Sequence, residues 1–514
     1  MPKWLKDAVF YEIYPQSFYD TNGDGIGDFN GIIEKLDYIK SLGCNALWIN
    51  PCYDSPFKDA GYDVRDYKKV APRYGTNSDL YRLFGEAHRR GMHVLLDLVP
   101  GHTSEEHAWF LESQKAGKNE YSNRYVWTNV AFQPAKGFPY IGGESERDGV
   151  YLLNFFKCQP ALNYGFQRCE EDWQLPPDHP DCIATREAMK DVMRFWLDHG
   201  CDGFRVDMAG SLVKNDDEKK TGTSALWKNV REMLDEEYPE AAMVSEWNEP
   251  MAAINQGGFH MDFFLNGKDN GYTTLLRDYE SGEDNSFFRK DGKGDITRFL
   301  EEYVPRYMAT KENGYYCLLT CNHDTMRPKY NLDDTELKIA YAFLFTMPGV
   351  PYLYYGDEIG MRYLDIPTKE GGYARTGSRT PMQWNDGKNA GFSTCPADAL
   401  YLPVDTAADA PNVAAQEADA DSLLNTVRTL LSLRHEQEDL QADAEFEVLY
   451  AESGKLPFVY RRGDLLLTLN PSAERVSAPV AVTGKEKKLL FSIGSGEINS
   501  GEITLEPQSF LVWK

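Results

Sequence analysis

The sequence predicts an α/β protein: a (β/α)8 barrel (TIM barrel) with a small domain inserted after its third strand and an antiparallel β-sandwich at its C-terminal end. Three observations predict this fold. Short apolar runs alternate with amphipathic segments in a strand–helix rhythm that repeats eight times. A long stretch rich in Gly, Asn, Pro and aromatic residues interrupts the rhythm after the third run. The last part of the chain carries only β patterns, separated by turn residues.

The barrel prediction depends on eight apolar runs with the length of buried strands. Amphipathic segments with helical spacing lie between them, and Gly43 and Gly91 follow two of these segments, where a helix commonly ends. Helices are expected at 31–42, 79–90, 184–199 and 224–237. The barrel strands are expected at 8–13, 45–49, 93–98, 202–206, 242–245, 261–265, 316–321 and 351–355.

The interruption is too long for a plain loop, which predicts a domain of its own. We therefore divide the chain into a barrel (1–102 and 171–436), an inserted domain (103–170) and a C-terminal β-sandwich (437–514). A further helix is expected at 422–435 behind Asp421 as its N-cap. The sandwich strands are expected at 446–449, 458–462, 465–470, 476–480, 488–491, 502–505 and 510–513.

The charge of the chain excludes some classes of partner. Its 54 Lys and Arg face 80 Asp and Glu among 514 residues, a formal net charge of −26. A nucleic-acid-binding protein needs a basic surface, and an anionic membrane would repel this chain, so neither partner is expected. A neutral substrate such as a sugar is compatible with this charge.

Cysteine usage and hydropathy indicate a cytoplasmic protein. The nine Cys are an odd number without Cys-x-x-Cys spacing, which argues against a disulfide framework and a zinc site. The first residues contain no apolar signal segment. The longest apolar run, 339–355, is interrupted by Pro348 and Pro351 and is interpreted as a helix followed by a strand. The oligomeric state is left open.

Polar clusters lie at the ends of four predicted strands. Asp97 and His102 follow the third strand, Asp207 ends the fourth, Glu246 follows the fifth, and Asp324 follows the seventh. Catalytic groups of such barrels lie at the C-terminal ends of the strands, so these side chains are expected to meet at one rim. Any single acid is more often a structural ion pair or a solvated loop residue. Four clusters at strand ends favour a functional site instead.

The acids suit the cleavage of a glycosidic bond, which needs one ionised and one protonated carboxyl. Arg205 lies two residues before Asp207 on the same strand face, and its guanidinium is expected to keep Asp207 ionised. Glu246 lies between an apolar strand and Trp247, where desolvation would favour the protonated form of an acid catalyst.

These clusters together resemble the motifs of glycoside hydrolase family 13, the α-amylase family. The resemblance implies Asp207 as nucleophile, Glu246 as general acid/base and Asp324 as the residue that fixes hydroxyls of the distorted sugar. The segment 59–63 resembles the loop whose Tyr stacks on this sugar, and 379–384 resembles a segment typical of α-glucosidase-like members. The residues implied to bind substrate or orient the nucleophile are Asp59, Tyr62, His102, Phe155, Arg205, His323 and Arg327.

A second site is expected between 20 and 28, where oxygen-bearing side chains alternate on a Gly-rich loop. This pattern suits a structural Ca²⁺, or Mg²⁺, and resembles the metal loop after the first strand of α-glucosidases. The position-twelve Glu of an EF-hand is missing, because Gly31 stands there. A tight turn without a metal is the alternative, and no organic cofactor is expected. The expected ligands are Asp20, Asn22, Asp24, Ile26 and Asp28.

The motif at 159–163 lies between the versions of the oligo-1,6-glucosidase and neopullulanase groups. The Lys-His pair of many endo-acting α-amylases and the Val of many α-1,6-specific members are both missing after Asp207. The resemblance therefore implies hydrolysis of short α-1,4-linked glucose oligosaccharides by an α-glucosidase or small-substrate α-amylase. The alternatives are a transglucosylase or isomerase such as trehalose synthase, an endo-acting α-amylase, and a non-catalytic protein on the same fold.

Overall fold

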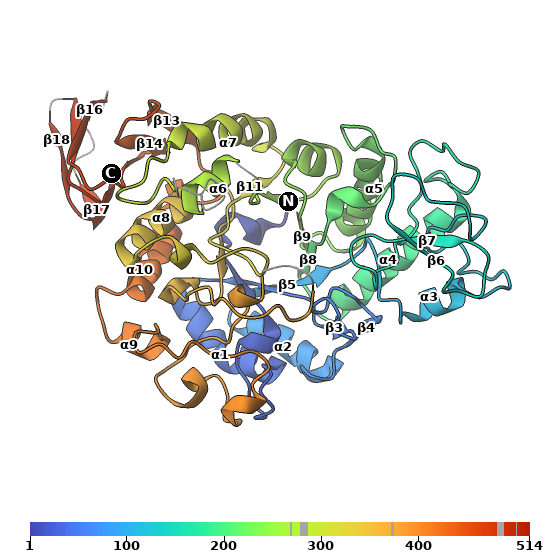
Figure 1. Ribbon diagram of the computed structural model, residues 1–514. Coiled ribbons are helices and arrows are strands. Elements are labelled where there is room, and N and C mark those ends of the chain that lie inside the picture. Colours follow the sequence, from blue (N-terminus) through green and yellow to red (C-terminus); the bar gives the residue numbers. More distant parts are fainter. Residues whose placement is uncertain (268–269, 278–285, 372–374, 481–487, 500) are drawn as a thin grey trace.

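The computed structural model describes residues 1–267, 270–277, 286–371, 375–480, 488–499 and 501–514. Eight parallel strands form one sheet in the order β11-β10-β9-β8-β5-β2-β1-β12, and a parallel bridge between Leu319 and Tyr352 joins its two ends. The predicted barrel is therefore confirmed (Figure 1). Its strands are β1 (Phe10–Ile13), β2 (Ala46–Ile49), β5 (His93–Leu98), β8 (Gly203–Val206), β9 (Ala242–Ser245), β10 (Met261–Phe263), β11 (Tyr315–Cys317) and β12 (Tyr352–Tyr354).

Helices lie around the outside of the barrel (Figure 1). The first ends where the sequence predicts, because Gly43 adopts a left-handed conformation with φ 98°. The last begins one residue later than predicted: Ser422, rather than Asp421, accepts a hydrogen bond from the Asn425 amide as the N-cap. The helices are α1 (Phe29–Leu42), α2 (Asn77–Arg89), α3 (Ala108–Ser113), α4 (Pro180–Asp198), α5 (Thr221–Glu237), α6 (Gly271–Leu276), α7 (Ile296–Thr310), α8 (Asp334–Thr346), α9 (Val413–Glu417) and α10 (Leu423–Glu436).

Two apolar cores hold the barrel together. Its interior contains large side chains such as Trp48, Phe263 and Tyr352, which are buried against one another. A larger core lies between the strands and the helices. Because both faces of the strands are covered, their residues are buried on both faces without alternation, as in parallel sheets generally. Among the described residues, no helix is both long and apolar enough to cross a bilayer.

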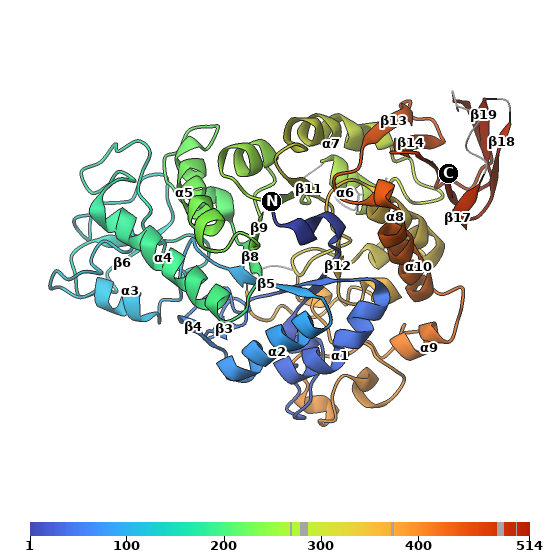
Figure 2. The same ribbon diagram turned by 180° about the vertical axis from the view of Figure 1, so that it is seen from behind.

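The segment that interrupts the barrel rhythm contains α3 and a small hairpin of β6 (Tyr140–Gly142) and β7 (Val150–Leu152) around a minor core of its own. A second short pair, β3 (Tyr53–Asp54) and β4 (Asp66–Val70), precedes it. Both views place this region on the side of the barrel opposite the C-terminal strands (Figures 1 and 2). A bridge between His102 and Ala161 joins its exit to the end of β5, so it borders the C-terminal rim of the strands.

The C-terminal strands form two antiparallel sheets, β13-β14-β15-β20-β17 and β16-β19-β18, which share an apolar core. The predicted sandwich is thereby confirmed, but the sequence analysis missed β18, whose Gly496 and Asn499 have the composition of a turn. The strands are β13 (Phe446–Tyr450), β14 (Phe458–Arg462), β15 (Leu465–Asn470), β16 (Val476–Pro479), β17 (Leu489–Ile493), β18 (Gly496–Asn499), β19 (Glu502–Leu505) and β20 (Ser509–Trp513).

Two buried guanidinium groups cover the C-terminal end of α8, and one of them comes from the sandwich. Arg434 on α10 donates to the carbonyl of Phe345 (2.8 Å), and Arg462 on β14 donates to the carbonyl of Thr346. Both carbonyls belong to the last turn of α8, where the helix has no internal partners for them and the helix dipole favours a cation.

Candidate active site

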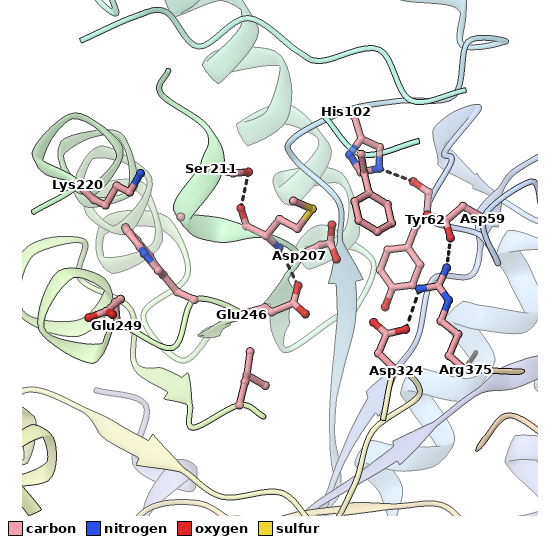
Figure 3. A pocket seen from close by; sticks show the side chains of 15 residues that line it. Asp59, Tyr62, His102, Asp207, Ser211, Lys220, Glu246, Glu249, Asp324 and Arg375 are labelled. Atoms are coloured by element: carbon pink, nitrogen blue, oxygen red, sulfur yellow. Dashed lines mark hydrogen bonds and ion pairs between the residues drawn. The ribbon is translucent and has the colours of Figure 1, made fainter. Parts of the chain in front are cut away.

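A cavity of about 550 Å³ opens at the C-terminal ends of the strands. It has the size of a small-molecule site, and side chains from separate strand ends converge on it (Figure 3). Asp207 follows β8, Glu246 follows β9, and Asp324 follows β11. The cavity is lined by Asp59, Tyr62, His102, Phe155, Asp207, Met208, Gly210, Ser211, Lys220, Glu246, Trp247, Glu249, Leu265, Asp324 and Arg375.

One guanidinium binds three carboxylates at the centre of this site. Arg205 on β8, 1 % exposed, lies 2.8 Å from Asp97, 3.0 Å from Asp207 and 2.9 Å from Glu246. Its two terminal nitrogens therefore bring Asp207 and Glu246 to the same side of the molecule. The Glu246 carboxylate also accepts a hydrogen bond of 3.0 Å from the Met208 amide, directly after the nucleophile candidate.

Sharing Arg205 changes the expected electrostatics of Asp207. Burial raises the pKa of the Asp207 carboxyl well above its usual value, and the Glu246 charge raises it further against the opposing effect of Arg205. Burial likewise raises the pKa of Asp97 to about 6. Burial and the neighbouring carboxylates of Asp97 and Glu246 thus oppose the effect expected of Arg205, which favours the ionised form of Asp207.

Asp324 has the opposite environment. Its carboxylate accepts hydrogen bonds from Arg375 (2.8 Å) and Arg379 (2.7 Å), and His323 lies 3.3 Å away. Although burial raises the pKa of Asp324, His323 and the two guanidinium groups together hold it below its usual value. Asp324 is therefore ionised at neutral pH.

Arg375 also closes this end of the cavity. It forms an ion pair with Asp59 as well as with Asp324, and both the Arg375 and Asp59 side chains are at most 4 % exposed (Figure 3). Gln159 donates a further hydrogen bond of 2.7 Å to Asp59. The structure thus joins the loop after β2, the inserted region and the segment after β12 into one polar wall.

Tyr62 and His323 form a stacked pair beside Asp324. Their ring centroids are 5.4 Å apart, and the Tyr62 hydroxyl lies 2.6 Å from Nε2 of His323 and 3.1 Å from Asp97. Glu12, fully buried on β1, lies 2.8 Å from Nδ1 of His323. His323 does not line the cavity itself, but it fixes the position of Tyr62, which does.

His102 lines the cavity with both ring nitrogens in contact with protein groups. Nε2 lies 3.1 Å from the Tyr62 carbonyl oxygen, and Nδ1 lies 3.0 Å from the amide nitrogen of Asn154. Burial lowers the pKa of His102 to about 4, so the ring is neutral at neutral pH.

Lys220 and Glu249 lie on the side of the cavity away from Asp59 and Arg375 (Figure 3), and Phe155 and Trp247 also line it. Phe155 is 43 % exposed, as expected for an aromatic side chain at a sugar entrance. Trp247 packs against Gly210, where a Cβ atom would come within 2.4 Å of the indole nitrogen. A glycine three residues after Asp207 therefore allows the indole to lie beside the acid/base candidate.

Arg327 lies outside the cavity, contrary to the implied substrate-binding role. Its guanidinium is fully buried and donates to Asp357 (2.8 Å) and to the carbonyls of Tyr355 (2.8 Å) and Ser378 (3.0 Å). These partners leave it a structural side chain that packs on Tyr354 and Tyr355.

The loop from Asp20 to Asp28 uses its oxygen atoms for internal hydrogen bonds. Asp20 accepts from the amides of Gly23 (2.7 Å) and Gly25 (2.8 Å), and Asp28 caps α1 through the Gly31 amide (2.8 Å). Asn22 and Asp24 each accept from the amide two residues later, the second from Ile26. In the described parts of the chain, no three acidic, His or Cys side chains come together as metal ligands. The ion stays a prediction.

Several polar residues of this site were not predicted from the sequence: Arg375, Ser211, Lys220 and Glu249 line the cavity, and Asn154 contacts His102. Arg375 lies in an irregular segment after β12 with no strand end or motif to mark it, and its distant partners, Asp59 and Asp324, cannot be inferred from spacing. Asn154 lies one residue before Phe155, which was identified. Its signal is Gly101 beside His102, a small residue that leaves room for the Asn154 amide.

Comparisons with known proteins agree on one family. Residues 12–443 match the α-amylase catalytic domain. The chain is 36 % identical over 471 residues to the trehalose synthase/amylase TreS of Mycolicibacterium smegmatis, covering 84 % of this chain and 76 % of the relative. It is 33 % identical over 541 residues to an oligo-1,6-glucosidase of Heyndrickxia coagulans, covering 93 % and 94 %.

Solved structures resemble the whole chain. The trehalulose synthase of Pseudomonas mesoacidophila superposes with a TM-score of 0.81 at 26 % identity over 100 % of both chains. A mutant isomaltulose synthase of Erwinia rhapontici, in complex with sucrose, gives the same TM-score and identity over 100 % of this chain and 99 % of the other.

Proposed function

Because this chain belongs to the α-amylase family, whose members here hydrolyse or transfer glucose from α-glucosides, we propose that it is a retaining α-glucosidase. Its substrates are short α-1,4-linked glucose oligosaccharides, from which it releases the terminal glucose. The observation that carries this proposal is the polar wall of Asp59, Arg375 and Asp324 at one end of the cavity. A sugar ring held against this wall has no room for a further unit beyond it, so the ring must be a chain end.

The arrangement of the two carboxyls supports double displacement. Glu246 protonates the oxygen of the leaving sugar while a carboxylate oxygen of Asp207 forms a bond to the anomeric carbon, and the glycosidic bond breaks. Glu246 then takes a proton from water as the water oxygen replaces Asp207, which leaves with its electron pair. Two inversions retain the configuration. With Glu246 protonated, the carboxylates of Asp97 and Asp207 still exceed the single charge of Arg205, and this excess negative charge stabilises the oxocarbenium-like transition state.

A second candidate function is transfer of the glucosyl group to a sugar in place of water. The relatives favour it, since one is named a trehalose synthase/amylase and the similar structures are sucrose-converting synthases. Trp247, Lys220 and Glu249 line the cavity on the Glu246 side, where a leaving sugar could stay bound and attack the intermediate. Both functions use the same two carboxyls and differ in the nucleophile of the second step.

The test is a time course of products from maltose, isomaltose, maltotriose, sucrose and trehalose. Hydrolysis of maltose gives glucose alone, whereas transfer gives trehalose or longer sugars. A maltooligosaccharide blocked at its non-reducing end should stay intact, because the wall excludes the blocking group. Cleavage of the blocked substrate would contradict the terminal action, and no turnover of any of these α-glucosides would contradict the proposal as a whole.

A further inference from the structure

A chain of hydrogen bonds crosses from the loop after Asp207 to the loop of Tyr62. Lys214 Nζ donates to Oδ1 of Asn154 (3.2 Å) and to the Ser211 carbonyl (2.7 Å). The Asn154 amide nitrogen lies 3.0 Å from Nδ1 of His102. Nε2 of the same ring lies 3.1 Å from the Tyr62 carbonyl, and Figure 3 shows this second contact. Three segments distant in sequence, one of them in the inserted region, therefore meet at one imidazole.

The chemistry of the two ends fixes the direction of every bond in this chain. An ammonium can only donate, so the oxygen of Asn154 must face Lys214 and its NH₂ group must face His102. Nδ1 of His102 then has to accept, which places the ring proton on Nε2. That proton is donated to the Tyr62 carbonyl, which can only accept. The neutral Nε2-protonated ring is the one form of His102 that completes all three bonds.

Gly101 makes room for the link. Its φ is not in the left-handed region, but a Cβ atom at this position would lie 2.7 Å from the Asn154 amide nitrogen. Any larger residue would push Asn154 away from His102. The glycine beside His102 is thus explained by close packing of the amide and not by backbone conformation.

We propose that Asn154, oriented by Lys214, is a positioning residue that holds His102 as the neutral Nε2-protonated ring and through it fixes Tyr62 at the sugar pocket. Phe155 follows Asn154 directly, so the same link sets the position of the exposed aromatic at the entrance. Only the expected effect on turnover rests on the proposed function; the hydrogen-bonded chain itself does not.

The decisive variant is Asn154→Asp. A carboxylate still binds Lys214 but can only accept, so His102 keeps both of its bonds only when it is doubly protonated. Burial and the Lys214 charge lower the pKa of His102 to about 4 in the natural chain. The new carboxylate raises this pKa, and the intact chain exists below it. The ratio of the kcat/KM of Asn154→Asp to that of the natural enzyme should therefore fall as the pH rises through the new pKa, whereas loss of the Glu246 proton lowers both values alike. The profiles are compared below pH 8, because burial lowers the pKa of Lys214 to about 8.

A second readout does not depend on turnover. Spectra of ¹⁵N-labelled imidazole, assigned to His102 with a His102→Gln variant, should show the Nε2-protonated neutral form in the natural chain at pH 7. In Asn154→Asp they should show a doubly protonated ring or a proton moved to Nδ1. If no α-glucoside is turned over, this measurement still tests the hydrogen-bonded chain, so failure of the proposed function can be told apart from failure of this inference.

Asn154→Ala and Lys214→Met should each lower kcat/KM roughly ten-fold or more, since a buried partner is left unsatisfied. Gly101→Ala should resemble Asn154→Ala. The matched controls are Asn129→Asp, an exposed amide of the inserted region, and Lys219→Met, an exposed lysine near Lys214. Identical pH profiles of Asn154→Asp and Asn129→Asp, or an unchanged imidazole spectrum in Asn154→Asp, would overturn the inference.

Discussion

The two ends of the reaction centre hold carboxylates in opposite electrostatic settings. On the Asp207 side, Arg205 is shared among three carboxylates, and burial raises the pKa of Asp207. On the other side, Asp324 is contacted by both Arg375 and Arg379, and its pKa is lowered. The number of guanidinium groups per carboxylate therefore separates a negatively charged half from a nearly balanced half.

This difference in charge suits the Asp207 side and the Asp324 side to different roles in the reaction. A centre with unbalanced negative charge suits the positive charge that develops on the sugar in the transition state. A carboxylate held ionised by two guanidinium groups suits hydrogen bonds from neutral hydroxyls, which do not change charge during the reaction. Four experiments test whether the two halves have these different roles, beginning with the largest expected effect.

The largest effect is expected on the Asp207 side. Asp207→Asn should lower kcat by roughly 10⁴-fold or more, because no covalent intermediate can form. Glu246→Gln should lower kcat/KM strongly for maltose but much less for an α-glucosyl fluoride, whose leaving group needs no proton. Steady-state rates on both substrates measure this, with the exposed Asp386→Asn as a control. Equal losses on the two substrates would contradict the role of Glu246 as acid.

A smaller loss is expected at the balanced end. Arg375→Ala leaves the buried Asp59 and Asp324 with one cation fewer and should lower kcat/KM for maltose roughly a hundred-fold. Removal of the wall should also allow slow cleavage of the blocked maltooligosaccharide. The control is Arg194→Ala, which breaks an exposed ion pair with Glu237 and should change little. Full activity of Arg375→Ala on maltose would show that this end does not hold the sugar.

The raised pKa of Asp207 also predicts an effect on stability. An acid with a raised pKa in the folded state favours folding while it is protonated, and that contribution is lost as the pH rises through the folded pKa. Because the folded state favours the ionised form of Asp207 less than the unfolded state does, this carboxyl destabilises the folded protein at pH 7, and Asp207→Asn should raise the thermal unfolding midpoint by a few degrees. The difference should shrink toward pH 4. Melting curves at both pH values measure it, and a variant that melts below the natural chain at pH 7 would contradict the assignment.

The smallest effect concerns the loop from Asp20 to Asp28. If this loop takes up the expected calcium ion, millimolar Ca²⁺ should raise the unfolding midpoint relative to EDTA, because binding stabilises the folded state. Asp24→Asn is the matched variant: the amide oxygen can still accept from the Ile26 amide, but a charge is lost. It should melt like the natural chain in EDTA and gain less from Ca²⁺. Identical melting of the natural chain in Ca²⁺ and EDTA would show that the internal hydrogen bonds hold the loop alone.

The parts of the fold that follow from local periodicity could be predicted closely. The bounds of β5 (His93–Leu98), β9 (Ala242–Ser245) and β14 (Phe458–Arg462) agree with the predicted runs, because each contains a short run of buried apolar residues. The edge strand β18 (Gly496–Asn499) could not be found this way, since its alternate residues face solvent and its composition is that of a turn.

The candidate site likewise has residues that could be predicted from the sequence and residues that could not. Asp207 and Glu246 could be located because barrel strands deliver their last residues to one rim. The sharing of Arg205, the closure by Arg375 and the link through Asn154 depend on loops whose mutual approach has no local signature. Arg327 shows the opposite error. Its place close to Asp324 in the sequence suggested that it binds the substrate, but its guanidinium donates to backbone carbonyls.

The buried guanidinium groups of Arg434 and Arg462 have a consequence for how the molecule comes apart. Both terminate the same helix, α8, and one of them belongs to a strand of the C-terminal sandwich. Removing that sandwich would remove the Arg462 guanidinium from the C-terminal end of α8 and would expose the carbonyl that this guanidinium binds. The sandwich therefore stabilises the barrel and is not an independent domain. We expect both to unfold on heating in a single cooperative transition.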